Sequence, residues 1–462
     1  MTREHATNIE KLIGEDGERV IARIVEISKA GRAPKNDAAI FALALCASIG
    51  NDKTRTAALG ALPIVCRTGT HLFQFATVCD GLRGWGRGLR KAVGNWYNLQ
   101  SPEALAYQLV KYGQREGWSH RDLLRLAHPV PSTEEHKVLY KWVVDSEMTG
   151  AMPLVEAVEK LKNASTAEAA TIVRESRVPR EAVPTELLAK AEIWEALLQD
   201  MPLTAMIRNL GNLSKCGLLR PGSAAAHKVI AELSNVERLK KARVHPIAIL
   251  NALATYAGGK GVRGSGEWIA VPKVVDALDA AFYKAFANVE PTGKRLVLGL
   301  DVSGSMRGTR VSGLVSLECR QAAGAMALVT AAAEKAVYNV AFDTSAYPLS
   351  ISGRQRLDDV VNLLARTGGG GTDCALPMTW ATKHNVQADA FVIYTDSETW
   401  AGRQHPAQAL DAYRQKTGIA AKAVIVAMAA NRFSIGDTRD AGTMTVVGFD
   451  ATVPEVIADF LR

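Results

Sequence analysis

The chain has 462 residues, a formal net charge of +8, and 48% hydrophobic and 22% charged residues. This composition is that of a globular protein and excludes a disordered or fibrous chain. The length allows about two to three domains.

Export and membrane insertion are not expected. No apolar run reaches the roughly 18 residues of a spanning helix, and the N-terminus lacks the apolar segment of a signal peptide. We therefore expect a cytoplasmic protein. The cysteines form no CxxC pair and have no histidine at metal-ligand spacing, so we expect buried, reduced thiols without disulfides or zinc. They are Cys46, Cys66, Cys79, Cys216, Cys319 and Cys374.

Residues 5–285 have a helical pattern throughout, because apolar runs of helical length alternate with short breaks of Gly, Pro, Ser and Asn. Helix starts are marked by the cap and first-turn proline at Ser101-Pro102 and by capping-box spacing after Ser119 and Ser132. No strict sequence period is visible. We therefore expect an α-solenoid of HEAT-type helix pairs that repeat in structure but not in sequence.

Positive charge is concentrated in this helical region, with 38 basic and 31 acidic residues in 1–290 against 17 and 16 in 291–462. Residues 81–100 and 201–231 contain no acid. The first stretch mixes cations with Trp85, Trp96 and Tyr97, which suits an RNA backbone with stackable bases, although a basic solvated face is the alternative. We expect both tryptophans in the core. The candidate RNA-binding cations are Arg83, Arg87, Arg90 and Lys91, with a second pair, Arg208 and Lys215, on one helix face.

The pattern changes near residue 290, after which short β-rich runs alternate with helical ones. Strands are expected at 296–300, 337–342, 390–394, 422–427 and 444–447, and helices around 318–335, 357–366 and 406–415 and from 454. This pattern predicts a doubly wound parallel sheet. We therefore predict a helical-repeat domain over 1–290 and an α/β domain over 291–462.

Polar side chains follow the first predicted strand at alternate positions, which directs them toward one point above the strand end. Their carboxylate and hydroxyl oxygens are hard ligands suited to Mg²⁺ or another divalent cation such as Mn²⁺. Two more oxygen ligands come from a glycine-rich loop and from the end of a later strand. The candidate ligands are Asp301, Ser303, Ser305, Thr372 and Asp396.

This D-x-S-x-S motif, followed by a threonine and a strand-end aspartate, resembles the metal-ion-dependent adhesion site of von Willebrand factor A domains. The resemblance implies a site that binds a partner's carboxylate rather than cleaving a substrate. Asp373 either supports the ligands from behind or caps the next helix, and the sequence leaves both open.

Signatures of catalysis are missing. The glycine-rich residues 258–265 have the wrong spacing for a P-loop and read as a flexible basic loop, HExxH is absent, and Ser303 lacks a GxSxG context. A two-metal nuclease would need several carboxylates. We therefore expect no enzyme.

Several segments of the helical region, joined to this A domain, carry a further resemblance. They are 86–93 (GRGLRKAV) with Trp96-Tyr97, Lys111-Tyr112, 115–129, 201–210, His245-Pro246 and Tyr283-Lys284. The whole chain resembles the TROVE module of the Ro autoantigen proteins and their bacterial orthologues, in the same domain order.

The resemblance implies a ring of helical repeats closed by the A domain. It implies small noncoding Y RNAs on a basic outer surface, single-stranded 3′ ends of misfolded RNAs in a central hole, and a 3′ exonuclease partner such as polynucleotide phosphorylase. No DNA or membrane partner is expected. Arg83, Arg87, Arg90 and Lys91 would face the hole or its rim.

By motif, the Y RNA contacts fall on Lys111, Arg115 and His128. Lys111 and Arg115 are four residues apart, so we expect them to share a helical face. His128 precedes Pro129, where a helix C-cap is the alternative role. His120 is expected to be the solvent-facing first residue of a helix. The leading hypothesis is an RNA-binding ribonucleoprotein component, and the alternative is a protein–protein adaptor built on the solenoid and the A domain.

Overall fold

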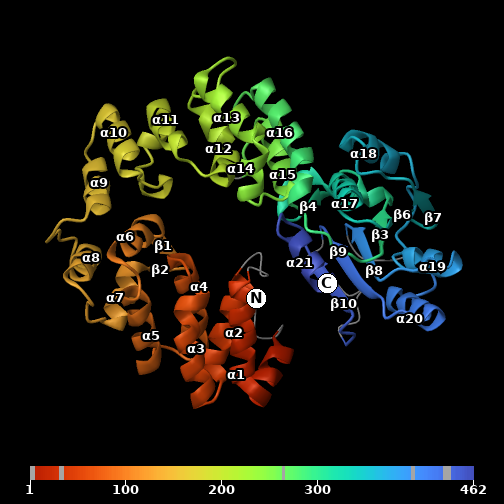
Figure 1. Ribbon diagram of the computed structural model, residues 1–462, viewed down its shortest axis with the longest axis horizontal. Coiled ribbons are helices and arrows are strands. Elements are labelled where there is room, and N and C mark those ends of the chain that lie inside the picture. Colours follow the sequence, from red (N-terminus) through yellow and green to blue (C-terminus); the bar gives the residue numbers. More distant parts are fainter. Residues whose placement is uncertain (1–5, 31–35, 263–265, 397–400, 430–438) are drawn as a thin grey trace. The chain divides into compact units, whose positions relative to one another are not determined.

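The computed structural model describes residues 6–30, 36–262, 266–396, 401–429 and 439–462 (Figure 1). The chain divides into two compact units, Met1–Asp200 and Met201–Arg462. No helix of the described residues is long and apolar enough to cross a membrane.

The first unit consists of helices and one short hairpin. The hairpin pairs β1 (Gln114–Arg115) with β2 (Trp118–Ser119) in antiparallel register. The helices are α1 (Thr7–Lys29), α2 (Asp37–Ile49), α3 (Asp52–Val65), α4 (Gly69–Leu82), α5 (Arg87–Asn98), α6 (Pro102–Lys111), α7 (His120–Ala127), α8 (Glu134–Asp145), α9 (Pro153–Leu161), α10 (Thr166–Ser176) and α11 (Ala191–Gln199), with 3-10 turns η2 (Arg180–Ala182) and η3 (Leu187–Ala189).

The core of this unit forms where consecutive helices pack in pairs. Helix α2 is apolar on all sides and lies against α1, α3 and α4, so its residues from Ala39 to Ala47 are almost all buried. Helix starts follow the predicted signals: Ser101 caps α6, and Ser119 forms a capping box with Asp122 at the start of α7. The predicted helical character of this region is confirmed, whereas the hairpin was not anticipated.

The second unit begins with helices and continues into an α/β domain. Its elements are α12 (Leu203–Lys215), α13 (Ala224–Ser234), α14 (Val236–Lys241), α15 (Pro246–Ala257), α16 (Pro272–Lys284), η4 (Ala285–Asn288), β3 (Leu296–Asp301), η5 (Gly304–Met306), β4 (Arg310–Val311), β5 (Leu314–Glu318), α17 (Cys319–Ala333), β6 (Val337–Phe342), β7 (Ala346–Leu349), α18 (Leu357–Ala365), α19 (Leu376–Lys383), β8 (Ala390–Thr395), α20 (Pro406–Thr417), β9 (Lys422–Ala427), β10 (Thr443–Val447) and α21 (Val453–Leu461).

The sheet of this unit has 6 strands in the order β10-β9-β8-β3-β6-β7. All neighbours pair in parallel except β7, which runs antiparallel to β6 at the edge. The predicted parallel α/β sheet is confirmed, because its central strands are continuous apolar runs buried on both faces. Strand β7 escaped prediction because it is a short edge strand containing Pro348.

The change from helices to strands occurs between η4 and β3, where the sequence places it. The boundary between the two compact units lies earlier, after Asp200, because α12–α16 belong to the same unit as the sheet. Arg356 donates to Asp279 (2.6 Å), and Leu357 N donates to the Tyr283 hydroxyl (2.9 Å), which joins α16 to the start of α18. The boundary at 290/291 therefore follows element type rather than compactness, and the ring remains a prediction.

Candidate metal site and nucleic-acid interface

The candidate metal ligands come together at the carboxyl ends of two central strands. Asp301 ends β3, and Asp396 directly follows the neighbouring strand β8. Thr372 lies in the loop between α18 and α19. Asp301, Ser303, Thr372 and Asp396 are buried, whereas Ser305 is exposed. A parallel sheet presents its strand ends at one edge, which is where such folds bind ligands.

Hydrogen bonds hold the first of these residues in a tight turn. Ser303 N donates to Asp301 Oδ1 (2.8 Å), and the Thr395 hydroxyl donates to Asp301 Oδ2 (2.6 Å). The Ser303 and Ser305 hydroxyl oxygens are 3.2 Å apart, so the two hydroxyls lie within hydrogen-bond distance of each other. Gly304 N donates to Gly370 O (3.3 Å), which joins this turn to the glycine-rich loop carrying Thr372.

Two buried carboxylates, Asp301 and Asp396, lie in this cluster. The pKa of Asp301 is raised to about 6. Burial is the main cause and the nearby charge of Asp396 adds to it, whereas the hydrogen bonds from Thr395 and Ser303 lower the pKa. Asp396 Oδ1 is buried and receives no hydrogen bond from the described residues. Both oxygens of Asp301 accept hydrogen bonds, so the deficit is on Asp396. A divalent ion coordinated through oxygen would fit beside these two buried carboxylates. The described residues hold no group of three or more His, Cys, Asp or Glu suited to a metal, and the candidate ligand set contains only two such residues.

A further carboxylate, Asp343, supports the glycine-rich loop. It follows β6, and its Oδ2 accepts from Gly370 N (2.9 Å) while its backbone oxygen accepts from Asp373 N (2.9 Å). Its position directly after a predicted strand could have singled it out. Asp373 Oδ1 accepts from the backbone N of Ala375 (3.0 Å), the residue before α19, although no side chain caps that helix.

Cations from the first acid-free stretch line a cleft in the first unit. Arg83 ends α4 and Arg87 begins α5, and both border a cleft of about 430 Å³ that Arg55 and Asp52 also line. Arg90 and Lys91 are exposed on α5, which carries no acid. The structure thus brings these predicted cations to one region of the first unit.

The two tryptophans of this stretch differ in burial. Trp96 is buried and donates from Nε1 to Cys66 O (2.5 Å), which confirms it as a core residue. Trp85 is partly buried and packs edge-on against Trp118 with ring centroids 5.5 Å apart.

Lys111 and Arg115 do not share a helical face, so that expectation is wrong. Helix α6 ends at Lys111, and Arg115 belongs to strand β1 of the hairpin. The turn uses Glu116 and Gly117, both with positive φ (54° and 79°), a conformation that continues neither helix nor strand. Lys111 Nζ donates to the Tyr107 hydroxyl (3.0 Å), whereas the Arg115 side chain is exposed.

The environment of Lys111 keeps it charged. Burial lowers its pKa, but the hydrogen bond with Tyr107, the phenols of Tyr107 and Tyr112, and the charge of Glu181 outweigh this and raise its pKa overall. Its ammonium also lies 5.1 Å and 5.5 Å from the centroids of the Tyr107 and Tyr112 rings.

His128 and His120 mark the two ends of α7. His128 is the C-cap in a left-handed conformation (φ 46°, ψ 52°), as the alternative role predicts, and its side chain is exposed. His120 is the first residue of α7 but only 2% exposed, so the expected solvent-facing position is wrong. Its ring is enclosed by the aromatic residues Phe73, Trp96 and Tyr97, and its Nδ1 lies 2.8 Å from the Tyr97 hydroxyl. Burial by distant segments leaves no signal in the local sequence.

The second predicted pair of cations belongs to the other unit. Arg208 and Lys215 are both exposed on α12. The cysteines are free thiols, and all but Cys216 are buried, as expected.

Comparisons with known proteins cover almost the whole chain. It matches the family model described as TROVE domain over residues 2–172 and 173–255, and the one described as Ro60 vWA domain over residues 295–461. It is 41% identical to a Deinococcus radiodurans protein named RNA-binding protein RO60, over 98% of this chain and 87% of that protein. A Caenorhabditis elegans protein of the same name is 36% identical, over 100% of this chain and 84% of the relative. The crystal structure of the Deinococcus radiodurans RO (RSR) protein superposes with a TM-score of 0.92, covering 98% of this chain and 93% of that chain.

Proposed function

The chain belongs to the Ro family of TROVE-domain proteins, and on that premise we propose that it is the protein component of a small ribonucleoprotein. It binds structured RNA through the basic surfaces of its first unit. The RNA is a small noncoding RNA of the Y type, and single-stranded 3′ ends of misfolded RNAs are a second class of ligand. A 3′ exonuclease is the partner that such a scaffold would serve.

The observation that supports this proposal is the exposed, acid-free cation surface of α5. Arg87, Arg90 and Lys91 lie on the solvent side of a helix whose other side packs into the core. The cleft beside it adds Arg83, whereas Arg55 in the same cleft is ion-paired with Asp52. Cations in such a density match a phosphate backbone rather than a single ion pair.

The residues assigned to Y RNA by resemblance are suited to the same task. Lys111, Arg115 and His128 sit at a helix end, in a hairpin strand and at a helix C-cap, respectively. Arg115 and His128 are exposed, and the Lys111 ammonium donates to the Tyr107 hydroxyl rather than to a carboxylate, so these side chains can contact phosphates.

The test is charge reversal of Lys111→Glu together with Arg115→Glu, measured by gel shift with the small structured RNA that copurifies from the native host. Loss of about two phosphate contacts lowers the slope of log affinity against log salt by roughly 2. The matched control is Lys160→Glu with Arg174→Glu, which changes the net charge equally at exposed positions of α9 and α10. Equal RNA affinity in the wild type and the Lys111/Arg115 variant would refute this placement.

We propose that the A domain holds Mg²⁺ through Asp301, Ser303, Ser305, Thr372 and Asp396. The buried, unpartnered Asp396 oxygen supports this assignment. Bound there, the ion would act as a Lewis acid that accepts a carboxylate from a protein partner, and with only two carboxylates in the ligand set we propose binding rather than catalysis.

A protein–protein adaptor is the second candidate function, and the candidate metal site of the A domain is the observation that favours it. EDTA separates the two functions, because it should abolish a metal-bridged protein contact while leaving RNA binding in place. Loss of RNA binding on EDTA treatment would contradict the separation of the RNA-binding surfaces from the metal site.

A further inference from the structure

A tryptophan of the second unit lies on the basic face of α12. Arg208, Gly211 and Lys215 are three and four residues apart, so they share one face of that helix. A Cβ added to Gly211 would lie 2.7 Å from the Trp268 ring, so the indole rests directly on the helix at this glycine. Trp268 is therefore flanked along the helix by two exposed cations.

The position of Trp268 is fixed by contacts from several segments. Its Nε1 donates to Tyr256 O (2.9 Å) and its backbone N donates to Gly259 O (2.9 Å). The buried Tyr256 ring stacks on the indole, with ring centroids 6.3 Å apart and an angle of 17° between the ring planes. Gly259 has φ 65°, and a Cβ there would lie 2.8 Å from Trp268 O. Gly211 thus makes room for the indole, and Gly259 makes room for the backbone carbonyl of the same residue.

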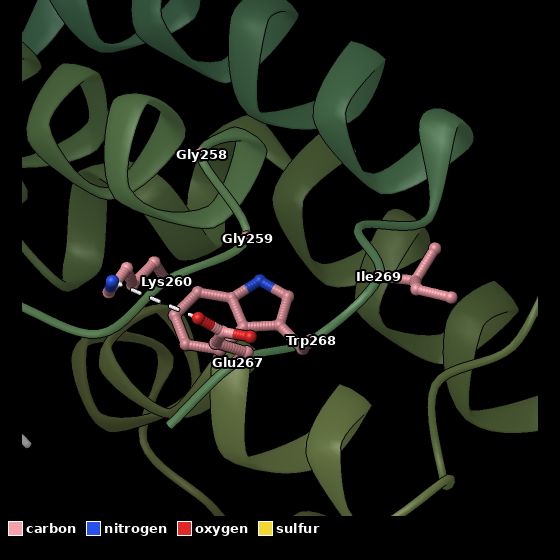
Figure 2. A pocket seen from close by; sticks show the side chains of 6 residues that line it. All are labelled: Gly258, Gly259, Lys260, Glu267, Trp268 and Ile269. Carbon is pink, nitrogen blue, oxygen red and sulfur yellow. Dashed lines mark ion pairs between the residues drawn. The ribbon is translucent and has the colours of Figure 1, made fainter. Parts of the chain in front are cut away.

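The remainder of the indole lines an open pocket of about 500 Å³, together with Gly258, Gly259, Lys260, Glu267 and Ile269. Figure 2 shows the indole beside the Lys260–Glu267 ion pair, with the Ile269 side chain pointing away from it. Ile269 is 90% exposed. A tryptophan that served only the core would be covered by its neighbours, whereas this one forms the wall of a pocket.

Lys260 lines the pocket, and Lys215 lies beside the same loop. The Lys260–Glu267 pair has an N–O distance of 3.8 Å and side chains that are 68% and 73% exposed, so it is weak and Lys260 can exchange partners. A Cβ on Gly266 would lie 3.9 Å from Lys215 Nζ, which places that ammonium beside the same loop. In the predicted flexible basic loop of residues 258–265, Gly261 N donates to Gly266 O (2.9 Å), and residues 263–265 lie outside the described part.

We propose that this pocket binds one unpaired nucleobase of single-stranded RNA. The base stacks on the indole of Trp268, and Arg208, Lys215 and Lys260 contact the flanking phosphates. An aromatic platform between cations is the arrangement that binds single-stranded nucleic acid with little sequence preference. The inference rests on the proposed RNA-binding function and assigns it a second site, separate from the cations of the first unit.

The experiment measures fluorescence anisotropy of labelled oligo(U) and oligo(A) RNA of about ten nucleotides, a typical site size, with the full chain. Trp268→Leu should weaken binding by about 5- to 150-fold, the range for loss of one stacked base, whereas Trp268→Phe should retain most of it. Gly211→Ala tests the same point without removing the indole, because the added methyl displaces the ring. Thermal denaturation of each variant confirms that the fold is intact.

The cations have a matched control. Arg208→Gln with Lys215→Gln should lower oligonucleotide affinity and the salt slope, whereas Lys335→Gln with Lys383→Gln, exposed positions of the A domain, should change neither. Photocrosslinking of 5-iodouracil RNA should yield a Trp268 adduct by mass spectrometry.

The outcomes separate this inference from the proposed function. Binding of the structured small RNA with no binding of the oligonucleotides would overturn the pocket and leave the proposed function intact. Oligonucleotide binding that is unchanged in folded Trp268→Leu, or a crosslink confined to the first unit, would also overturn it. Failure to bind either RNA would refute the proposed function itself.

Discussion

The buried His120 should make the region around the β1–β2 hairpin sensitive to acid. His120 begins α7, its backbone N donates to Gly113 O (3.4 Å), and a Cβ on Gly69 would lie 2.8 Å from its Nε2. Its ring therefore fills the space between α4, α7 and the segment that leads to Arg115. A positive charge on this ring would be surrounded by Phe73, Trp96 and Tyr97 without an acidic partner.

The size of the loss in stability follows from the shift in the pKa of His120. Burial lowers the pKa of His120 from 6.5 to about 3. The unfolded chain therefore binds this proton below pH 6.5 while the folded chain does not. Stability is full above pH 6.5 and is lost as the pH falls toward 3. Between about pH 7.5 and pH 5 the loss amounts to about 2 kcal/mol.

Native-state hydrogen exchange, read by mass spectrometry on peptides from the hairpin and α7, gives the free energy of opening at both pH values. The wild type should lose about 2 kcal/mol more than His120→Gln between them, because glutamine keeps a polar contact for Tyr97 but does not titrate. The difference between the two pH dependences is the relevant quantity, since other groups titrate equally in both proteins. Equal losses would refute the placement of a neutral histidine in this core.

Three further outcomes are expected. Asp301→Ala should abolish the heat of Mg²⁺ binding in isothermal titration calorimetry and leave RNA affinity unchanged; a parallel loss of RNA binding would contradict the separation of the sites. Gly368→Ala should lower stability by about 1–3 kcal/mol in thermal denaturation, because φ is 70° there and the added Cβ would lie 2.6 Å from Val302; an unchanged melting temperature would show that the loop relaxes. Arg356→Ala should lower the free energy of unfolding by about 1 kcal/mol, because it removes a largely exposed ion pair with Asp279 and a guanidinium that lies 4.3 Å from the Tyr283 ring centroid. An unchanged free energy of unfolding would mean that this contact does not join α16 to α18.

The elements of the fold were largely predictable because their signals are local. Strands β3, β6, β8 and β9 are short apolar runs, and turn residues and helix caps mark the ends of the segments between them. The order of the strands along the chain also placed Asp301 and Asp396 at strand ends, so their meeting at one edge follows from parallel pairing. Asp343 carries the same signal and was missed.

Contacts between distant segments could not be predicted in this way. The spacing of Lys111 and Arg115 indicated one helical face, but helix α6 ends at Lys111, and Arg115 pairs with β2 in the hairpin. His120 has the sequence context of an exposed first-turn residue, and its burial depends on aromatic rings contributed by α4 and α5.

The sequence by itself determined the helical and α/β character of the two regions, the positions of the candidate oxygen ligands after β3 and the locations of positive charge. Only the tertiary structure decided that Trp268 lies on Gly211 between Arg208 and Lys215. The physical reason is range: periodicity, caps and turn residues act through neighbours along the chain, whereas burial and the grouping of side chains depend on which distant segments pack together.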